Sequence, residues 1–308
     1  MSTPTSDRII FFGTDAFSVP TLVRLLAENW PIVAVVTKPD SRTGRGQQLT
    51  APAVKRLALA ASIPVFQPEG KLADISADLG ALRPTAGIVV AYGKIIPAAI
   101  RDLFPKGLIN IHASLLPAYR GASPIEAAIL HGDAVTGVTL MQIEAGLDTG
   151  PTYDAAKLQL AGTETRLDLY ERLAELGAEF TSSKLASILD GTIVPLPQDN
   201  ARATTVSLIQ KSDGHIDWTN PADHLERQIR AYLGWPGSHA HLAGTDVIIT
   251  AAHVSPKPGE PGIACTSASG ELAVHSGEGS LIIDRLKPAG KREMTGLEFL
   301  AGHPLPKA

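Results

Sequence analysis

The residues best suited to chemistry lie in two short polar segments, with Asn110 and His112 in the first and Asp148 in the second. Asn110 and His112 are two positions apart, so at the end of a strand both side chains leave the same face. When an amine attacks an acyl carbon, an oxyanion forms and a proton is released. An amide, an imidazole and a carboxylate supply the hydrogen-bond donors and the proton acceptor for that reaction. The trio therefore predicts acyl transfer to an amine.

Composition indicates an ordinary globular chain. The 308 residues carry a formal net charge of −4 and are 44% hydrophobic, and a chain of this length usually forms about two domains. No uninterrupted apolar stretch of about 18 residues offers a membrane span, and the N-terminus does not resemble a cleavable signal. Cys265 is the only cysteine, which excludes internal disulfides and thiolate metal clusters and fits a reducing compartment. We expect a cytoplasmic protein with no membrane role.

Short apolar runs alternate with helical patterns over the first two thirds of the chain. The expected strands are 9–12, 32–36, 64–66, 87–90, 108–111 and 138–143. The expected helices are 19–29, 53–62, 72–82, 97–103 and 165–190. This alternation predicts an α/β fold with a doubly wound, mostly parallel sheet. Such sheets bind ligands at the carboxyl ends of their strands, which is where the 114–117 loop is expected.

A change of composition near residue 191, where prolines and polar residues accumulate, predicts a linker. We place a catalytic domain at 1–190, the linker at 191–206 and a C-terminal domain at 207–308. Within the last, a helix at 221–231 precedes further expected strands at 239–242, 246–254, 262–266, 271–275 and 280–286. The glycine-rich turns between these strands predict a small β-barrel.

Nucleotide and metal sites are not indicated. The turn after the first expected strand, Gly13 to Ser18, contains no Gly-x-Gly-x-x-Gly pattern, and the chain has no P-loop lysine motif. We therefore reject NAD and ATP as ligands. Histidines outside the trio lack metal-ligand spacing and cysteine partners, so no metal is expected.

Further motifs extend along the whole chain. They are Phe12-Gly13-Thr14 with Phe17, Lys38-Pro39-Asp40, Gly44-Arg45-Gly46, Val90-Ala91-Tyr92-Gly93, Asn110 to Pro117, Arg120-Gly121, Gly146 to Gly150, Ile216-Asp217-Trp218, Ile229-Arg230-Ala231, Trp235-Pro236-Gly237 and Pro288 to Lys291. Together they resemble the methionyl-tRNA formyltransferase family from Arg8 to Leu300. The resemblance implies a Rossmann-like formyltransferase catalytic domain followed by a small OB-like β-barrel domain that binds tRNA.

The resemblance also implies the reaction. The formyl group of 10-formyltetrahydrofolate, a co-substrate, passes to the free amine of methionine on initiator tRNA, for translation initiation. By similarity, Asn110 holds the formyl oxygen, His112 paired with Asp148 donates to the developing oxyanion, and Asp148 helps to carry the proton. Taken singly, a buried His or Asp is usually a satisfied polar group. The combined pattern favours catalysis.

Two binding surfaces follow from the same resemblance. The folate pocket is expected to be lined by Val90, Ala91, Tyr92, Ser114, Leu115, Leu116, Pro117 and Leu147. The residues expected to contact tRNA are Lys38, Arg42 and Arg45, in a polar stretch predicted to be a mobile loop, and Lys287, Lys291 and Arg292 in the C-terminal domain. For both basic segments a purely solvated loop or turn is the alternative.

Two other functions stay open at this point. A folate-dependent formyltransferase acting on an amino sugar nucleotide would keep the trio and the folate pocket, but it would not need the basic loop. A non-catalytic folate-dependent RNA-binding protein would bind both substrates without formyl transfer. No dimer motif is evident in the sequence, which favours a monomer.

Overall fold

The computed structural model describes residues 7–43 and 47–305. The chain forms two compact units. The first comprises Met1–Gly121, Thr136–Leu158 and Tyr170–Thr205, and the second comprises Ala122–Val135, Gln159–Leu169 and Val206–Ala308. Each unit therefore takes segments from both sides of residue 190, and the limits of the linker at 191 and 206 stay a prediction.

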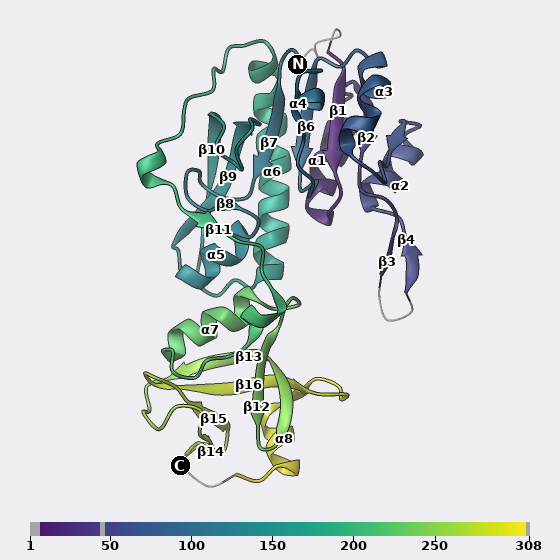
Figure 1. The fold of residues 1–308 in the computed structure, drawn as a ribbon. Helices are drawn as coiled ribbons and strands as arrows, with labels where there is room; N and C mark the ends of the chain where they lie inside the picture. Colours follow the sequence, from purple (N-terminus) through teal and green to yellow (C-terminus); the bar gives the residue numbers. More distant parts are fainter. Residues whose placement is uncertain (1–6, 44–46, 306–308) are drawn as a thin grey trace. The chain divides into compact units, whose positions relative to one another are not determined.

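The first unit is built on a seven-stranded sheet (Figure 1). Its strands, in spatial order, are β10 (Thr152–Gln159), β9 (Val135–Gln142), β7 (Leu108–His112), β6 (Ala86–Val90), β1 (Ile9–Gly13), β2 (Ile32–Val36) and β5 (Val65–Phe66). Neighbours from β7 to β5 are parallel, whereas β7 and β9 are antiparallel. The predicted doubly wound, mostly parallel sheet is confirmed. Strand β10 was not predicted, because its alternating, half-exposed side chains lack the apolar run of a buried strand.

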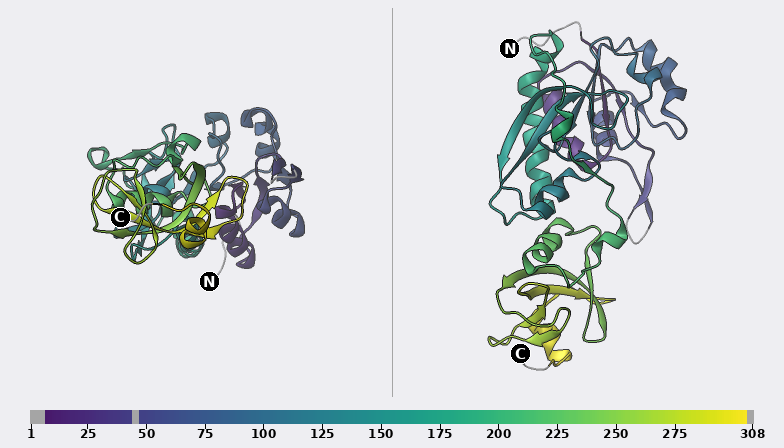
Figure 2. Two further views of the ribbon diagram at one scale, coloured as in Figure 1. Left: turned by 90° about the horizontal axis from the view of Figure 1, so that it is seen from below. Right: turned by 60° about the vertical axis from the view of Figure 1, so that its left-hand side comes forward.

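The helices of the first unit begin close to their predicted positions, except that the helix predicted at 72–82 starts with a 3-10 turn. They are α1 (Val19–Ala27), α2 (Ala53–Ala60), α3 (Ser76–Ala81), α4 (Ala98–Arg101) and α6 (Arg166–Leu189), with short 3-10 turns at Ala16–Ser18, Leu72–Ile75 and Asn200–Arg202. Helix α6 runs along the sheet (Figure 2), where its Gly177 packs against Ile111 of β7 and Val138 of β9. This close approach braces the strand that ends at His112.

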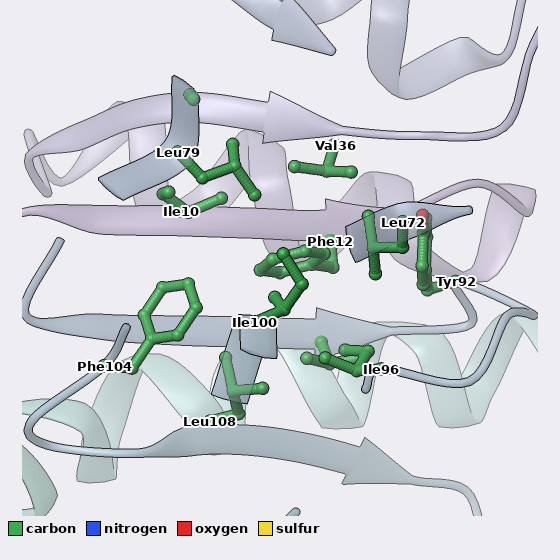
Figure 3. Close-up of a cluster of buried hydrophobic side chains, with 12 residues drawn as sticks. Ile10, Phe12, Val36, Leu72, Leu79, Tyr92, Ile96, Ile100, Phe104 and Leu108 are labelled. Atoms are coloured by element: carbon green, nitrogen blue, oxygen red, sulfur yellow. The ribbon is translucent and has the colours of Figure 1, made fainter. Parts of the chain in front are cut away.

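A hydrophobic cluster holds the central strands of the first unit together (Figure 3). Its buried members are Ile10, Phe12, Ala34, Val36, Leu72, Leu79, Val89, Tyr92, Ile96, Ile100, Phe104 and Leu108. The ring of Phe12 packs edge-on against Tyr92 and Phe104, with centroid distances of 5.7 and 5.9 Å. Removal of this apolar surface from water fixes β1, β6 and β7 side by side, and with them the position of the strand ends.

The polar stretch after β2 contains an antiparallel hairpin. Strand β3 (Ser41–Thr43) pairs with β4 (Gln48–Thr50), so the described part of the stretch forms two short paired strands, and the mobility of the loop stays a prediction. Arg42 lies on β3, whereas Arg45 lies outside the described residues.

The second unit contains a six-stranded antiparallel sheet, which confirms the predicted small barrel domain. The strands are β12 (Ser238–Leu242), β13 (Thr245–Ser255), β14 (Ala264–Thr266), β15 (Leu272–His275), β16 (Ser280–Pro288) and β17 (Met294–Thr295). The helices are α5 (Pro124–His131), α7 (Ala222–Ala231) and α8 (Gly296–Gly302), with a 3-10 turn at Lys211–Gly214. Leu225, Ile229 and Phe299 bring α7 and α8 into its hydrophobic core. Across the described ranges of the chain, no helix is long and apolar enough to span a membrane.

Two short strands complete the secondary structure, β8 (Arg120–Gly121) and β11 (Thr205–Val206). The backbone N–H of Arg120 donates to Thr204 O at 2.8 Å. Residues just beyond the long helix α6 are thereby tied to the segment that follows β7.

Candidate active site

Strand β7 carries two residues of the predicted catalytic trio. Asn110 lies opposite Val89 of β6 and Met141 of β9, and His112 lies opposite Thr139 of β9. Because side chains alternate along a strand, Asn110 and His112 share one face. Asn110 is half-buried, and its side chain forms no hydrogen bond with another described residue. Its amide is therefore free to donate to a ligand.

The loop after β7 is fixed by a threonine of the neighbouring strand. The Oγ1 of Thr139 donates to Ser114 O at 2.6 Å and accepts from the N–H of Leu116 at 3.0 Å. The Oγ of Ser114 in turn donates to Ala118 O at 2.6 Å. These bonds satisfy polar groups that burial would otherwise leave unpaired, and they hold the loop in one conformation.

The two ring nitrogens of His112 have different partners. The Nε2 atom lies 2.9 Å from Tyr119 O, and because a carbonyl only accepts, Nε2 carries a proton and donates it. The Nδ1 atom lies 3.7 Å from Asp148 Oδ2. This is an ion-pair distance but too long for a direct hydrogen bond. Nδ1 is therefore the nitrogen through which His112 can act on a substrate.

Asp148 is held by backbone and side-chain groups from outside its own loop. Its Oδ2 accepts from the N–H of Gly121 at 2.9 Å, and its backbone oxygen accepts from Gln198 Nε2 at 2.8 Å. Asp148 has a φ of +51°, in the left-handed region that non-glycine residues seldom adopt. Its side chain is 16% exposed, so the carboxylate is largely shielded from solvent and close to the imidazole.

The structure thus brings the predicted trio together from two separate segments. Asn110 offers amide donors, His112 an imidazole and Asp148 a carboxylate, a combination that can stabilise an oxyanion and relay a proton. Among residues 7–43 and 47–305, no three His, Cys, Asp or Glu side chains are grouped so that they could hold a metal ion.

The residues predicted to bind folate fall into two groups by burial. Val90, Tyr92 and Ser114 are fully buried, and their side chains belong to the interior of the unit. The accessible ones are Ala91, Leu115, Leu116, Pro117 and Leu147. Leu147, directly before Asp148, is 72% exposed. Accessible apolar surface beside polar groups is what a flat aromatic ligand would cover, so the second group fits a folate.

Tyr92 shows how deep the first group lies. Its side chain points into the hydrophobic cluster beside Phe12 and Ile96 (Figure 3). Its hydroxyl is buried without a hydrogen-bond partner among the described residues, and burial raises the pKa of Tyr92 to about 12. This phenol is held neutral inside the core.

In the first unit, the basic residues predicted to contact tRNA have different environments. Lys38 is half-buried, with its Nζ beside Gly93. Arg42 is exposed on the hairpin, and its guanidinium donates to Gln47 O over 3.4 Å. Arg42 forms no ion pair with a described residue, so its charge can meet a phosphate.

In the second unit, acidic residues accompany the predicted tRNA contacts. Lys287 is half-buried, Lys291 is exposed, and Arg292 forms an ion pair with Glu298 at 3.0 Å. The backbone N–H of Thr295 and, to a smaller extent, the guanidinium of Arg292 donate hydrogen bonds that lower the pKa of Glu298. Glu298 therefore stays ionised and partly neutralises Arg292.

The sequence analysis missed Gln198, which it placed in the linker. Its Nε2 donates to the loop that carries Asp148, and its Oε1 accepts from Arg120. A lone glutamine among prolines and polar residues has no local pattern that reveals such contacts. Arg120 was noted only as part of a motif.

Two family models match the chain. "Formyl transferase" covers residues 7–185, and "Formyl transferase, C-terminal domain" covers residues 208–304. With the fold and the trio, these matches define the class as formyltransferases. A methionyl-tRNA formyltransferase of Trichlorobacter lovleyi is 41% identical over 299 residues, 97% of this chain and 95% of the relative. Another, of Pseudomonas putida, is 44% identical over 92% of both chains. The chain belongs to the methionyl-tRNA formyltransferase family.

Solved structures share the fold at lower identity. The N-formyltransferase from Helicobacter canadensis, in complex with folinic acid and dTDP-3-aminofucose, has a TM-score of 0.70 and 19% identity and covers 94% of this chain and 100% of that one. HypX from Aquifex aeolicus, in complex with tetrahydrofolic acid, has a TM-score of 0.63 and 15% identity over 98% of this chain. This chain spans 48% of HypX. At such identities the likeness concerns the fold alone.

Proposed function

We propose that the protein transfers the formyl group of 10-formyltetrahydrofolate to the amino group of methionine carried by initiator tRNA. It acts as a monomer in the cytoplasm, where charged tRNA is used. The observation that carries the proposal is the meeting of Asn110, His112 and Asp148 at the end of β7. The chain in which they meet is 41% and 44% identical, over nearly its whole length, to named methionyl-tRNA formyltransferases.

In the proposed reaction the neutral amine attacks the formyl carbon and a new C–N bond forms. The formyl oxygen becomes an oxyanion, which accepts hydrogen bonds from the Asn110 amide and from protonated Nδ1 of His112. The bond from the formyl carbon to N10 of the folate then breaks. The proton lost by the amine reaches N10 through Asp148, whose carboxylate lies 3.7 Å from Nδ1. The products are a formamide and tetrahydrofolate, and no covalent acyl-enzyme is formed.

Surfaces around the trio support two substrates. The exposed Leu147 and the half-buried Leu115, Leu116 and Pro117 offer apolar contacts to the folate rings. Of the remaining proposed folate contacts, Ala91 is exposed, and Val90, Tyr92 and Ser114 support this surface from within the fold.

For the tRNA we propose phosphate contacts by basic residues of both units. They are Lys38, Arg42, Arg45, Lys287, Lys291 and Arg292. Contacts of this kind give affinity that falls as salt concentration rises.

The test is a transfer assay with competing acceptors. The purified protein is incubated with 10-formyltetrahydrofolate and charged initiator methionyl-tRNA, and formyl-methionine and tetrahydrofolate are measured together. Uncharged tRNA and an amino sugar nucleotide serve as comparison acceptors. We expect stoichiometric products only with charged tRNA. Formylation of the sugar alone would overturn the proposed acceptor, and no transfer to any acceptor would overturn the proposed reaction.

The proposed monomer has its own measurement, light scattering after size-exclusion chromatography. A mass near 32.3 kDa supports it, whereas a mass twice as large contradicts it.

A further inference from the structure

Gln198 lies after α6, and its side-chain amide is fully engaged in hydrogen bonds. Both protons of Nε2 are donated to backbone oxygens, to Asp148 O at 2.8 Å and to Gly150 O at 2.7 Å. The Oε1 atom accepts from Nε of Arg120 at 3.0 Å and from Nη2 of Arg120 at 2.8 Å. One amide therefore connects the loop of the proposed proton carrier to a buried arginine.

Arg120 is itself held in place by burial and by hydrogen bonds. It is only 7% exposed, and its Nη2 also donates to Asn200 Oδ1 at 2.8 Å. The next residue, Gly121, donates its N–H to Asp148 Oδ2 at 2.9 Å. The same short strand thus holds the carboxylate of Asp148 directly and its backbone oxygen through Gln198.

The loop benefits from such support because its backbone is in a sparsely populated conformation. Asp148 has a φ of +51°, in the left-handed region that few non-glycine residues adopt, although Asp tolerates it better than most. At the far end of the loop, Gly150 packs against the backbone of Gln142, leaving no room for a Cβ. The two bonds from Gln198 hold the carbonyls on either side of Thr149, so they fix the turn between these anchors.

We propose that Gln198 is a positioning residue, which keeps the carboxylate of Asp148 in place beside His112 by holding the backbone of the loop. The inference rests on the proposed function, since it assigns a role to Gln198 through Asp148. A shift of about 1 Å in a reacting group can reduce a rate by roughly 100-fold. Support from outside the reacting groups therefore contributes measurably to the rate.

The test replaces the side-chain amide of Gln198 by a carboxylate of nearly the same shape. In Gln198→Glu a carboxylate oxygen can still accept from Arg120, but the two N–H donors are lost and an acceptor faces two carbonyl oxygens. The matched control is Gln228→Glu. Gln228 is a buried amide of the second unit whose Nε2 donates to His215 O at 3.2 Å and to Asp213 O at 3.5 Å.

Two readouts report on position rather than on folding. The first is kcat and the KM of both substrates over a range of pH, so that an effect of the added charge on the pH profile is separated from a loss of rate. The second is amide hydrogen exchange of residues 146–150. Both are repeated with Gln198→Glu in an Asp148→Asn background. Gln198→Asn, which keeps the amide but is one methylene shorter, is measured in parallel in case Gln198→Glu does not fold.

We expect Gln198→Glu to lower kcat by roughly 10- to 100-fold, with both KM values within about twofold of wild type and faster exchange at 146–150. In the Asp148→Asn background the further loss should stay below about twofold, because the group that Gln198 positions is already changed. Gln228→Glu should lower the melting temperature and leave kcat within about twofold of wild type.

Several outcomes would overturn the inference. One is that the wild type is active and Gln198→Glu has the same kcat. Another is that Gln198→Glu lowers kcat by the same factor in the wild-type and the Asp148→Asn backgrounds. If the wild type transfers no formyl group, the proposed function fails, and exchange alone decides whether Gln198 holds the loop. Unchanged exchange at 146–150 would then contradict the positioning role as well.

Discussion

Each unit buries a histidine, and the two are held in different ways. His112 in the first unit is 6% exposed and His275 in the second is 9% exposed. Ser280 Oγ donates to Lys257 O at 2.5 Å, so it must accept from His275 Nδ1 at 2.8 Å. This leaves His275 Nε2 as the acceptor for the thiol of Cys265 at 3.5 Å. The thiol of Cys265, both ring nitrogens of His275 and the hydroxyl of Ser280 therefore all have partners.

The chain of hydrogen bonds at His112 is open by comparison. Its Nε2 is committed to a carbonyl, but Nδ1 faces Asp148 across 3.7 Å. A buried polar network that is fully paired stabilises the fold, whereas a ring nitrogen without a hydrogen-bond partner, beside a carboxylate, is available to donate to a substrate. Burial alone therefore does not separate a structural histidine from one suited to catalysis; the partners of its two nitrogens do.

The largest expected effect is at His112. His112→Ala should lower kcat by roughly 100- to 1,000-fold, the usual cost of removing one hydrogen-bond donor to an oxyanion. Asn110→Ala and Asp148→Ala should each cost a similar amount, and the losses should not add, because the three groups act together. Single-turnover formylation measures the loss, and melting temperature and folate binding serve as controls. Near-normal turnover in any of the three variants would remove that residue from the proposed mechanism.

At His275 we expect the opposite outcome, a loss of stability without a loss of kcat. His275→Ala leaves Cys265 and Ser280 without their partner and opens a cavity, so it should lower the free energy of unfolding by about 2 kcal/mol. The kcat of the folded fraction should stay at the wild-type value. Urea denaturation gives the first quantity and the transfer assay the second. A large loss of kcat with an unchanged unfolding midpoint would mean that the paired histidine is also functional.

Much of the first unit could be predicted because local pattern and tertiary role agree there. The apolar runs became β1, β2, β6 and β7, and the spacing of Asn110 and His112 placed both on one face of β7.

Helix α5 of the second unit was missed, although it also carries local signals, with Pro124 at its start and Gly132 in a left-handed conformation at its end.

Other features could not be read from the sequence, because long-range contacts create them. Gln198 donates to the backbone oxygens of residues 148 and 150. Every residue has a backbone oxygen, so no pattern of side chains in the sequence indicates which ones Gln198 contacts. The family motif placed Tyr92 near the folate, but a motif does not state which way a side chain points. The structure directs it into the core.

A smaller effect is expected for the exposed arginines, which also differ in whether a protein group already pairs with them. Arg42 forms no ion pair with a described residue, whereas Arg292 pairs with Glu298 at 3.0 Å. Arg42→Ala should raise the KM for methionyl-tRNA about fivefold and reduce the slope of log KM against log salt by about one, as expected on losing a phosphate contact. Arg292→Ala should change KM by less than about twofold. Equal effects would show that tRNA displaces Glu298 from Arg292.

The smallest expected effect is at Tyr92, and it tests whether an unpaired buried polar atom always indicates a functional position. Its hydroxyl is uncommitted like Nδ1 of His112, yet it lies in the hydrophobic cluster. If its role is structural, Tyr92→Phe removes an unpaired buried group and should raise the free energy of unfolding by about 1 kcal/mol, with the KM for 10-formyltetrahydrofolate unchanged. A raised KM would instead place the hydroxyl at the folate.

The pH dependence gives a second reading of the same variant. Burial raises the pKa of Tyr92 from 10.0 to about 12, so the neutral phenol is favoured in the folded state. The stability linked to it is complete below pH 10 and is lost as the pH rises towards 12, because the unfolded chain releases the proton first. Tyr92→Phe should therefore widen its advantage over wild type across this range, which thermal unfolding measured between pH 9 and 12 would detect. A constant difference would show that the hydroxyl reaches solvent or a polar partner, and the contrast between Tyr92 and Nδ1 of His112 would then rest on a wrong placement of the phenol.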